Sequence, residues 1–186
     1  KIPVEKIAVS VFAGDEDAPR DEESAKKWKE LGIPEERIAY LGKEPNWWPT
    51  PRKDIVTGEL KNAFGPCGPD TEMFIWTGKD LAPEIFDPED KNWVEVWNDV
   101  FMEFNRKTDG TLEELPQKNV DTGMGLERML AVLNGKDNDY ETDLFLPIIE
   151  SIENVYENRY KDHEKSMRII ADHLKATTFI IGEGVE

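Results

Sequence analysis

The sequence has little of what metal-stapled, disulfide-linked or membrane proteins need. It contains a single cysteine, Cys67, and two histidines, His163 and His173, which excludes a disulfide within the chain and gives no zinc-site spacing. No apolar run approaches the ~20 residues of a membrane span, and no basic-then-apolar leader opens the chain. We therefore expect no structural metal, no zinc, no membrane association and a cytoplasmic location.

Basic residues are also scarce. The 186 residues include 23 Lys and Arg against 40 Asp and Glu, which gives a formal net charge of −17. Because nucleic-acid affinity comes mainly from neutralisation of phosphates by Lys and Arg, we expect this chain alone to bind RNA poorly. Hydrophobic residues make 38% and charged residues 34%, which is typical of a globular chain with one sizeable core.

The first 44 residues have the pattern of a β-α-β unit. Residues 7–12 are an apolar strand, residues 21–31 have the spacing of an amphipathic helix, and residues 37–42 are a second short strand. Residues 14–19 between the first strand and the helix are acidic, and we expect them to be a solvated connection. This region shows no constellation of catalytic side chains.

Residues 45–69 are rich in Pro, Gly, Trp and Asn and are too broken for regular structure. Large aromatic side chains such as Trp47 and Trp48 would be wasteful on a mobile linker, so they either line a ligand pocket or pin the loop to the core. Both interpretations stay open. Residues 65–69 predict a stiff turn, in which Cys67 is a packing residue because nothing nearby is basic enough to lower its pKa.

Residues 93–105 give the longest strand pattern. Alternate positions share one face, and all but one of them are apolar. These positions are Val94, Val96, Asn98, Val100, Met102 and Phe104. A buried amide costs on the order of a few kcal/mol unless its hydrogen bonds are met, so either a neighbouring strand or a ligand must satisfy Asn98.

Residues 121–128, with the sequence DTGMGLER, have the pattern of a strand followed by a helix. The helix is predicted by apolar residues at helical spacing, which are Leu126, Met129, Leu130 and Leu133, and by Gly135 as its stop. The glycines allow close approach of a ligand, and the helix start and Arg128 attract an anion. Asp121 could bind a cation, an ammonium group or a metal. Alternatively, it only caps the helix, within an ordinary turn.

Two further helices are predicted near the end of the chain. Residues 143–156 form the first, and Ser166 can cap the second. The second helix has one stripe of side chains, formed by Ile169, Ile170, His173, Leu174 and Thr177. We expect His173 to lie at the edge of a core.

Residues 120–128 resemble motif 3 of the alanyl-tRNA synthetases, in which a strand leads into a helix carrying an ATP-binding arginine. Other segments match that family in the same order, so the resemblance covers nearly the whole chain. They are residues 65–69 (GPCGP), 71–72, 95–102, 143–145 and 168–173. The resemblance implies an α+β fold, with a class II antiparallel sheet flanked by helices and a β-α-β insertion at the N-terminal end.

The same resemblance implies a division into three parts. Residues 1–44 are the β-α-β insertion, residues 45–143 the C-terminal half of the catalytic domain, and residues 144–186 helices that lead into a tRNA-recognition domain. The family's motifs 1 and 2 are missing, and the chain begins without Met. We therefore expect a fragment that is inactive alone.

Site residues follow from the resemblance alone. Those implied for the amino acid are Trp48, Asn98, Val100, Asp121 and Gly123, and those for ATP are Gly125 and Arg128. No residue is a covalent catalyst, because this chemistry depends on positioning and charge stabilisation. Two departures stand out: residues 49–64 separate Trp48 from the next matching segment, and Asp70 replaces a second cysteine that the family often has.

The resemblance implies ATP-dependent activation of alanine and transfer to tRNA(Ala). Mg²⁺ is expected on the ATP phosphates, and tRNA contacts mainly outside this chain. The rival interpretation is a non-catalytic carbohydrate-binding module that stacks sugars on tryptophans. Its platforms would be Trp47, Trp48, Trp76, Trp93 and Trp97. It leaves residues 121–128 unexplained.

Overall fold

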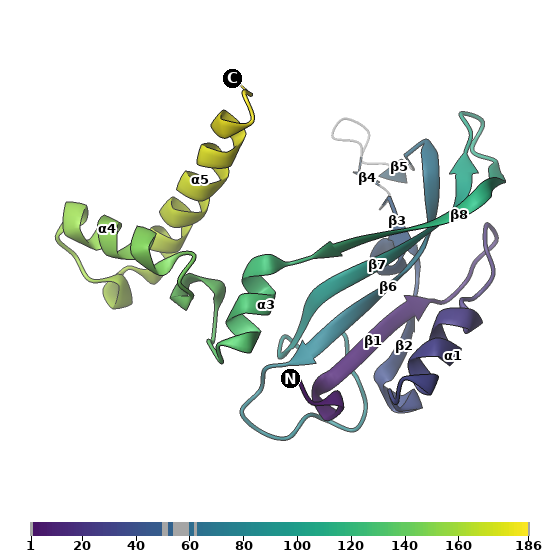
Figure 1. The fold of residues 1–186 in the computed structure, drawn as a ribbon, viewed down its shortest axis with the longest axis horizontal. Helices are drawn as coiled ribbons and strands as arrows, with labels where there is room; N and C mark the ends of the chain where they lie inside the picture. The colour runs from purple at the N-terminus through teal and green to yellow at the C-terminus, as the bar shows by residue number, and fades with distance from the viewer. Residues whose placement is uncertain (1, 50–51, 54–59, 62, 186) are drawn as a thin grey trace. The chain divides into compact units, whose positions relative to one another are not determined.

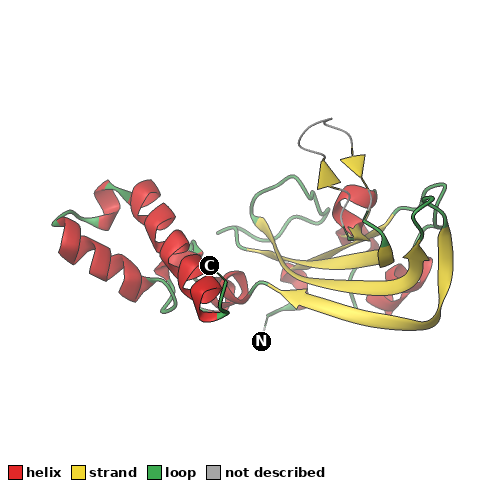
Figure 2. Cartoon of the chain, turned by 90° about the horizontal axis from the view of Figure 1, so that it is seen from above, coloured by secondary structure: helices red, strands yellow, loops and turns green. Residues whose placement is uncertain are grey.

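The computed structural model describes residues 2–49, 52–53, 60–61 and 63–185, and the chain divides into two units after Gly125. Figure 1 gives the elements their labels. Among these described residues, all the strands lie in the first unit, Lys1–Gly125, and the second unit, Leu126–Glu186, has only helices and their connections (Figure 2). The predicted mixture of α and β structure is confirmed.

The strands of the main sheet lie in the order β2-β1-β6-β7-β8, with β3 also paired to β6, and β4 and β5 form a separate pair. Their bounds are β1 Ile7–Phe12, β2 Ile38–Leu41, β3 Trp47–Trp48, β4 Arg52–Lys53, β5 Leu60–Lys61, β6 Gly65–Trp76, β7 Trp93–Arg106 and β8 Leu112–Met124. The α-helices are α1 Glu22–Glu30, α2 Lys43–Asn46, α3 Leu126–Leu133, α4 Leu146–Tyr156 and α5 Glu164–Gly182. Short 3-10 helices are η1 Val4–Lys6, η2 Glu35–Arg37, η3 Asp139–Glu141 and η4 Tyr160–Asp162.

The predicted β-α-β unit is present. β1 and β2 pair in parallel, from Val9 opposite Ile38 to Phe12 opposite Leu41, and α1 connects them. The carboxylate of Asp21 accepts a hydrogen bond of 2.9 Å from the Ser24 backbone N–H and so caps α1. β1 also pairs antiparallel with β6, so this unit is continuous with the rest of the sheet.

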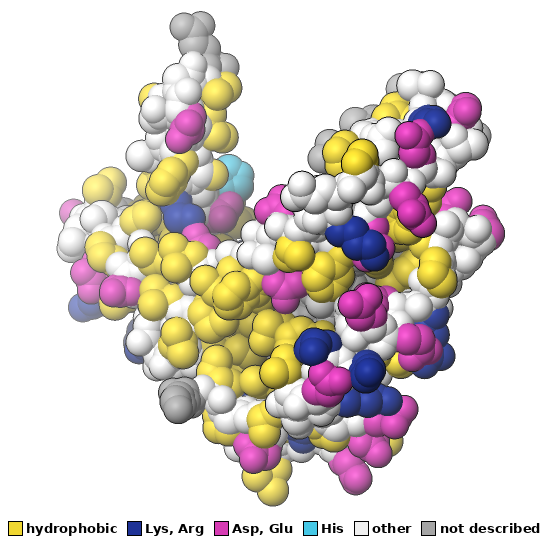
Figure 3. Space-filling model, turned by 45° about the vertical axis from the view of Figure 1, so that its right-hand side comes forward, with side chains coloured by type: hydrophobic (Ala, Val, Ile, Leu, Met, Phe, Trp, Pro, Cys, Tyr) yellow, Lys and Arg dark blue, Asp and Glu magenta, His cyan; other side chains and the backbone are white. Residues whose placement is uncertain are grey.

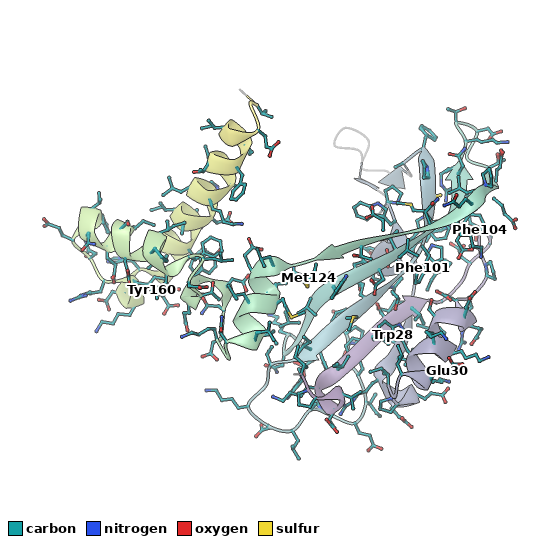
Figure 4. All side chains as sticks on the ribbon, viewed as in Figure 1. Trp28, Glu30, Phe101, Phe104, Met124 and Tyr160 are labelled. Carbon is teal, nitrogen blue, oxygen red and sulfur yellow. The ribbon has the colours of Figure 1, made fainter. Side chains whose placement is uncertain are left out.

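One face of the sheet is covered by α1, and we call it the helix face. Its buried core consists of Val9, Val11, Ala25, Ile33 and Ile38. Trp28 of α1, labelled in Figure 4, packs against this cluster. Its indole N–H donates a 2.8 Å hydrogen bond to the Thr71 hydroxyl of β6. The apolar positions of α1 and β1 therefore hold the helix on the sheet.

The opposite face, which we call the polar face, carries Ser10, Asp70, Glu72, Asn98 and Val100. Directly paired residues of antiparallel strands point to the same side, and the register pairs Ser10 with Glu72, Glu72 with Asn98, and Asp70 with Val100. Two apolar clusters flank these polar residues. Their buried members are Ala8, Phe74, Trp76, Phe86 and Trp93 in one, and Phe12, Ala18, Trp47 and Cys67 in the other.

The predicted turn at residues 65–69 is wrong, because β6 runs through it from Gly65. Its pairing with β7 is irregular between Cys67 and Asp70, where Pro69 has no backbone N–H to donate. A Cβ added to Gly68 would lie 1.8 Å from the carbonyl oxygen of Phe101, so only glycine lets the two backbones approach this closely.

The prediction that Val94 shares a face with Asn98 is also wrong. Met73 pairs with Trp97, but Phe74 pairs with Glu95, so Val96 is an extra residue in β7. Such a bulge reverses the alternation of side chains beyond it. The predicted alternation holds from Asn98 to Val100, and these two are the predicted site residues on β7.

The acidic loop at residues 14–19 is anchored rather than only solvated. Asp17 pairs with Lys43 and, at 3.1 Å, with the buried guanidinium of Arg106, and Asp15 pairs with Lys43 at 2.6 Å. The hydrogen bond from Lys43 is the main reason that the pKa of Asp17 lies below its usual value. The loop therefore neutralises a buried cation at the end of β7.

Trp47 pins residues 45–48 to the core. Its side chain is 1% exposed, and its ring centroid lies 5.3 Å from that of Phe12 and 6.1 Å from that of Phe104. Cys67 lies in the same cluster, and burial raises the pKa of its thiol. The prediction that Cys67 is a packing residue is confirmed, and of the two interpretations of Trp47 the structural one is correct.

The second unit has its own core, formed by Phe145, Ile149, Met167 and Ala171. α4 begins at Leu146, three residues later than predicted, with proline in its first turn. α5 begins at Glu164 after His163, so Ser166 lies inside the helix and does not cap it. The predicted stripe of α5 is not its buried face, because Ile170 and Leu174 are about half exposed and His173 is exposed.

No helix in the described part of the chain is both long enough and apolar enough to span a membrane. On the face drawn in Figure 3, acidic side chains are scattered among hydrophobic and basic ones and do not form a single patch.

Candidate active site

Four of the predicted site residues lie side by side on β7 and β8. Asn98 is paired with Gly123, and Val100 is paired with Asp121. Because directly paired residues share a face, all four lie on the polar face of the sheet. Strand pairing thus brings together an amide, an apolar wall, a carboxylate and a glycine from segments more than 20 residues apart.

Asn46 also belongs to this group and lies beside Asp70 of β6. No sequence pattern marked it as a site residue. It is fully buried at the end of the short helix α2, and its amide N–H₂ donates to the Ser10 hydroxyl at 2.8 Å. The same group donates to Asp70, at 3.2 Å to the backbone oxygen and 3.1 Å to the carboxylate. The pairing of Trp47 with Pro69 places Asn46 beside Asp70.

Asp70 is the most unusual group on this face, since it is a carboxylate that is only 1% exposed. Burial raises its pKa to about 7, while hydrogen bonds from the side chains of Asn46 and Asn98 oppose this rise. The sequence signal was present, because Asp70 stands where the resembling family often has cysteine. The sequence alone marks this position only as the loss of a cysteine and gives no sign of the partners of Asp70.

Of the two polar groups of the Asn98 amide, only one has a hydrogen-bond partner among the described residues. Its side chain hydrogen-bonds to Asp70, but its Oδ1 is buried and has no partner in the parts of the chain that the structure describes. Asn46 Oδ1 is in the same condition. An unpaired buried acceptor commonly costs about 1 to 3 kcal/mol, which is recovered if a ligand donates to it.

Asp121 and Gly123 are exposed above this row of buried groups. A Cβ built on Gly123 would meet nothing within 4 Å, so the space beside it is open. Asp121 lies within β8, three residues before its end, and is not the residue that precedes α3, which argues against the capping interpretation. Trp48, on β3, pairs with Gly68 of β6 and is 43% exposed.

Gly125 ends the first unit, and its backbone N–H donates a 3.0 Å hydrogen bond to the carbonyl of Val96. This bond fixes the end of β8 to the bulge of β7. Arg128 is exposed in the first turn of α3, in the second unit. There, burial raises the pKa of Asp139 and the charge of Arg128 opposes that shift.

A separate hollow of about 500 Å³ lies on the helix face, between α1 and the strands β7 and β8. Its lining includes Trp28, Phe101 and Val120. We do not equate it with the site, because Asn98, Val100, Asp121 and Gly123 all face the other way. Within the described ranges, no three His, Cys, Asp or Glu side chains lie close enough together to hold a metal ion.

The carbohydrate-binding interpretation is contradicted by the burial of the tryptophans that it needs. Trp47, Trp76 and Trp93 are 1%, 7% and 4% exposed, so their ring faces are not available to stack on a sugar. They pack instead with neighbouring aromatic rings, as the 5.2 Å separation of the Trp76 and Trp93 centroids illustrates.

The sheet is antiparallel except for the β1–β2 pair, and its last long strand leads through two glycines into a helix, which agrees with the fold of the class II aminoacyl-tRNA synthetases. The chain belongs to this family: the family model described as tRNA synthetases class II (A) matches residues 1–186.

Relatives of this chain carry a more specific name. This chain is 47% identical over 187 residues to the alanine–tRNA ligase of Treponema denticola and 46% identical over 187 residues to that of Borrelia hermsii. It is 44% identical over 189 residues to that of Treponema pallidum. The alignments cover 98%, 98% and 99% of this chain. The chain spans 30% of the length of each of these relatives.

Proposed function

We propose that this chain is the C-terminal half of the aminoacylation domain of an alanine–tRNA ligase. The parent enzyme activates alanine with ATP to give alanyl-adenylate and pyrophosphate, and then transfers the alanyl group to tRNA(Ala). The observation that carries the proposal is the group of Asn98, Val100, Asp121 and Gly123 on one face of the sheet. The names of the relatives support it.

Alanine offers a protein few groups to hold, since burying its methyl group contributes at most about 1 kcal/mol. The charged ends of the amino acid must therefore supply most of its orientation. In this proposal Asp121 pairs with the α-ammonium group, Val100 limits the size of the side-chain pocket, and Asn98 supplies a polar contact. Gly123 leaves room for the amino acid, and Trp48 forms a wall.

ATP is assigned to the end of the same segment. Gly125 lets the nucleotide approach the backbone, and Arg128 at the start of α3 contacts its terminal phosphates, with charge-assisted hydrogen bonds commonly worth about 1.5 to 3 kcal/mol. Mg²⁺ enters bound to the ATP phosphates. The residues act by positioning alanine and the α-phosphate and by stabilising charge, without a covalent protein nucleophile.

The third substrate, tRNA(Ala), binds mainly through parts of the parent outside this chain, because a net charge of −17 disfavours contact with phosphates. The helices of the second unit lead into that tRNA-recognition region. A cytoplasmic enzyme of translation fits this set of partners.

The decisive experiment is Asp121→Asn in the full-length enzyme, followed by alanine-dependent ATP–pyrophosphate exchange. Asparagine keeps the size and most hydrogen bonds of aspartate but cannot pair with a cation. We expect near-normal thermal stability, an unchanged KM for ATP and a KM for alanine that rises at least tenfold.

The matched control is Glu114→Gln, which makes the same charge change at an exposed position of β8 opposite Phe104. It should leave both KM values unchanged. Normal alanine activation by the Asp121→Asn variant would refute the assignment of Asp121.

A further inference from the structure

Asp70 lies between two asparagines from different parts of the chain. Asn46 comes from α2, 24 residues before Asp70, and Asn98 comes from β7. The Asn46 amide donates to the Asp70 carboxylate at 3.1 Å, and a hydrogen bond from the Asn98 side chain lowers the pKa of the same carboxylate. Asp70 itself is 1% exposed. Neither amide oxygen has a partner among the residues described. Each amide is therefore held through its N–H₂ group, and its oxygen remains without a partner in the part of the chain that the structure describes.

An ionised carboxylate can only accept hydrogen bonds, and an amide can donate only through its N–H₂ group. Asp70 therefore determines which way each amide is turned: the N–H₂ group faces Asp70, and the oxygen faces away from it. For Asn98, this orientation turns the buried Oδ1 away from Asp70. The strand pairing places Asn98 beside Gly123 on the polar face, where an oxygen without a partner can accept a hydrogen bond from a bound cationic group.

We propose that Asp70 is a positioning residue that holds the Asn98 amide with its oxygen toward the α-ammonium group of the amino acid substrate. This inference rests on the proposed function, because it needs the amino acid to bind on the polar face. Asp121 supplies the opposite charge, and Asn98 adds a directional acceptor that depends on Asp70. Asn46 holds the Asp70 carboxylate in place, because its N–H₂ group donates to both the Ser10 hydroxyl and this carboxylate.

The arrangement depends on the charge of Asp70. When the carboxyl group is protonated, it becomes a donor, and one of the two asparagines must turn its oxygen toward it. Burial raises the pKa of Asp70 to about 7, so this change falls in the physiological range. The charged groups facing it are Glu72 on β6, Glu95 on β7, which also raises the pKa of Asp70, and Asp121 beyond Val100 on β8.

The test measures the KM for alanine of the full-length enzyme by ATP–pyrophosphate exchange between pH 6 and pH 8.5. For a required carboxylate with a pKa near 7, the KM for alanine should rise about tenfold from pH 8 to pH 6, since each pH unit below the pKa lowers the ionised fraction about tenfold. Asp70→Asn should raise the KM at pH 8 by about as much and flatten the profile. The KM for ATP should not change.

Asp99→Asn is the matched control, because Asp99 is the next residue of β7 after Asn98 and burial also raises its pKa, but it faces α1 with Thr71. It should keep the wild-type pH profile. A flat wild-type profile, or an Asp70→Asn variant with an unchanged alanine KM, would overturn the inference. An enzyme with no alanine-dependent exchange at any pH would instead overturn the proposed function. If Asp70→Asn does not fold, the wild-type profile alone decides.

Discussion

The two faces of the main sheet are built from the same strands but bury different chemistry. On the helix face, the buried positions of β1 are Val9 and Val11, and the hydroxyl of Thr71 accepts a hydrogen bond from the Trp28 indole and donates one to the backbone oxygen of Ser10. On the polar face, Asp70, the residue of β6 before Thr71, is a buried carboxylate, and Asn98 of β7 has a buried amide oxygen with no partner among the described residues.

This difference separates stability from binding within a single strand pair. Burying apolar side chains against α1 stabilises the sheet, whereas burying a carboxylate and two amides with unpaired oxygens costs stability. A protein retains such a cost where a ligand or a reaction needs the groups. We therefore expect substitutions on the two faces to differ in kind, and the following four measurements test that difference.

The largest effect should come from the aromatic core that supports the polar face. Trp47→Ala removes a ring that is 1% exposed and packed on Phe12 and Phe104, and should lower the free energy of unfolding by about 3 to 5 kcal/mol. Its neighbour Trp48, at 43% exposure, provides the control: Trp48→Ala should cost less than about 1 kcal/mol. Denaturant unfolding of both variants measures the contrast, and equal losses would contradict it.

The next effect is a pH dependence of stability. A carboxyl group whose pKa is raised from 3.8 to about 7 on folding binds a proton more tightly in the folded state. The free energy of unfolding should therefore fall as the pH rises from about 4 to 7, by an amount on the order of a few kcal/mol. Asp70→Asn should remove this slope. Asp99→Asn should change it less, because Asp99 is only half-buried.

A smaller loss is expected at the anchored acidic loop. Asp17→Asn leaves the buried guanidinium of Arg106 without its carboxylate and should cost about 2 kcal/mol. Because the pKa of Asp17 is lowered, this stabilisation should be lost as the pH falls below about 4. Asp15→Asn breaks a pair with Lys43 but keeps the partner of Arg106, so it should cost clearly less. Equal thermal shifts for the two variants would argue against the role of Arg106.

The smallest effect should lie on the helix face. Thr71→Val removes the acceptor of the Trp28 indole N–H and should lower the free energy of unfolding by about 1 kcal/mol. It should leave the alanine KM unchanged, in contrast to Asp70→Asn at the preceding position. A rise in the alanine KM of the Thr71→Val variant would show that the two faces are coupled.

Local patterns in the sequence were enough to predict helices whose apolar spacing or terminal glycine is visible in the sequence. Gly135, with a φ of +61°, follows the end of α3 as expected, and the helix predicted over residues 21–31 is present as α1. The alternation predicted for β7 also placed Asn98 and Val100 on one face. These features depend on residues only a few positions apart, which is the range over which periodicity and capping act.

Tertiary structure alone decided which faces meet and what they bury. The bulge at Val96, the burial of Asp70 and the pairing of Asp17 with Arg106 depend on strands and loops that are far apart in sequence, by 89 residues in the last case. No local pattern marks such partners, because an aspartate has the same local signal whether it ends in solvent, beside an arginine or between two asparagines. Only the register of β6 against its neighbours turns Asp70 from a solvated side chain into a buried group with a shifted pKa.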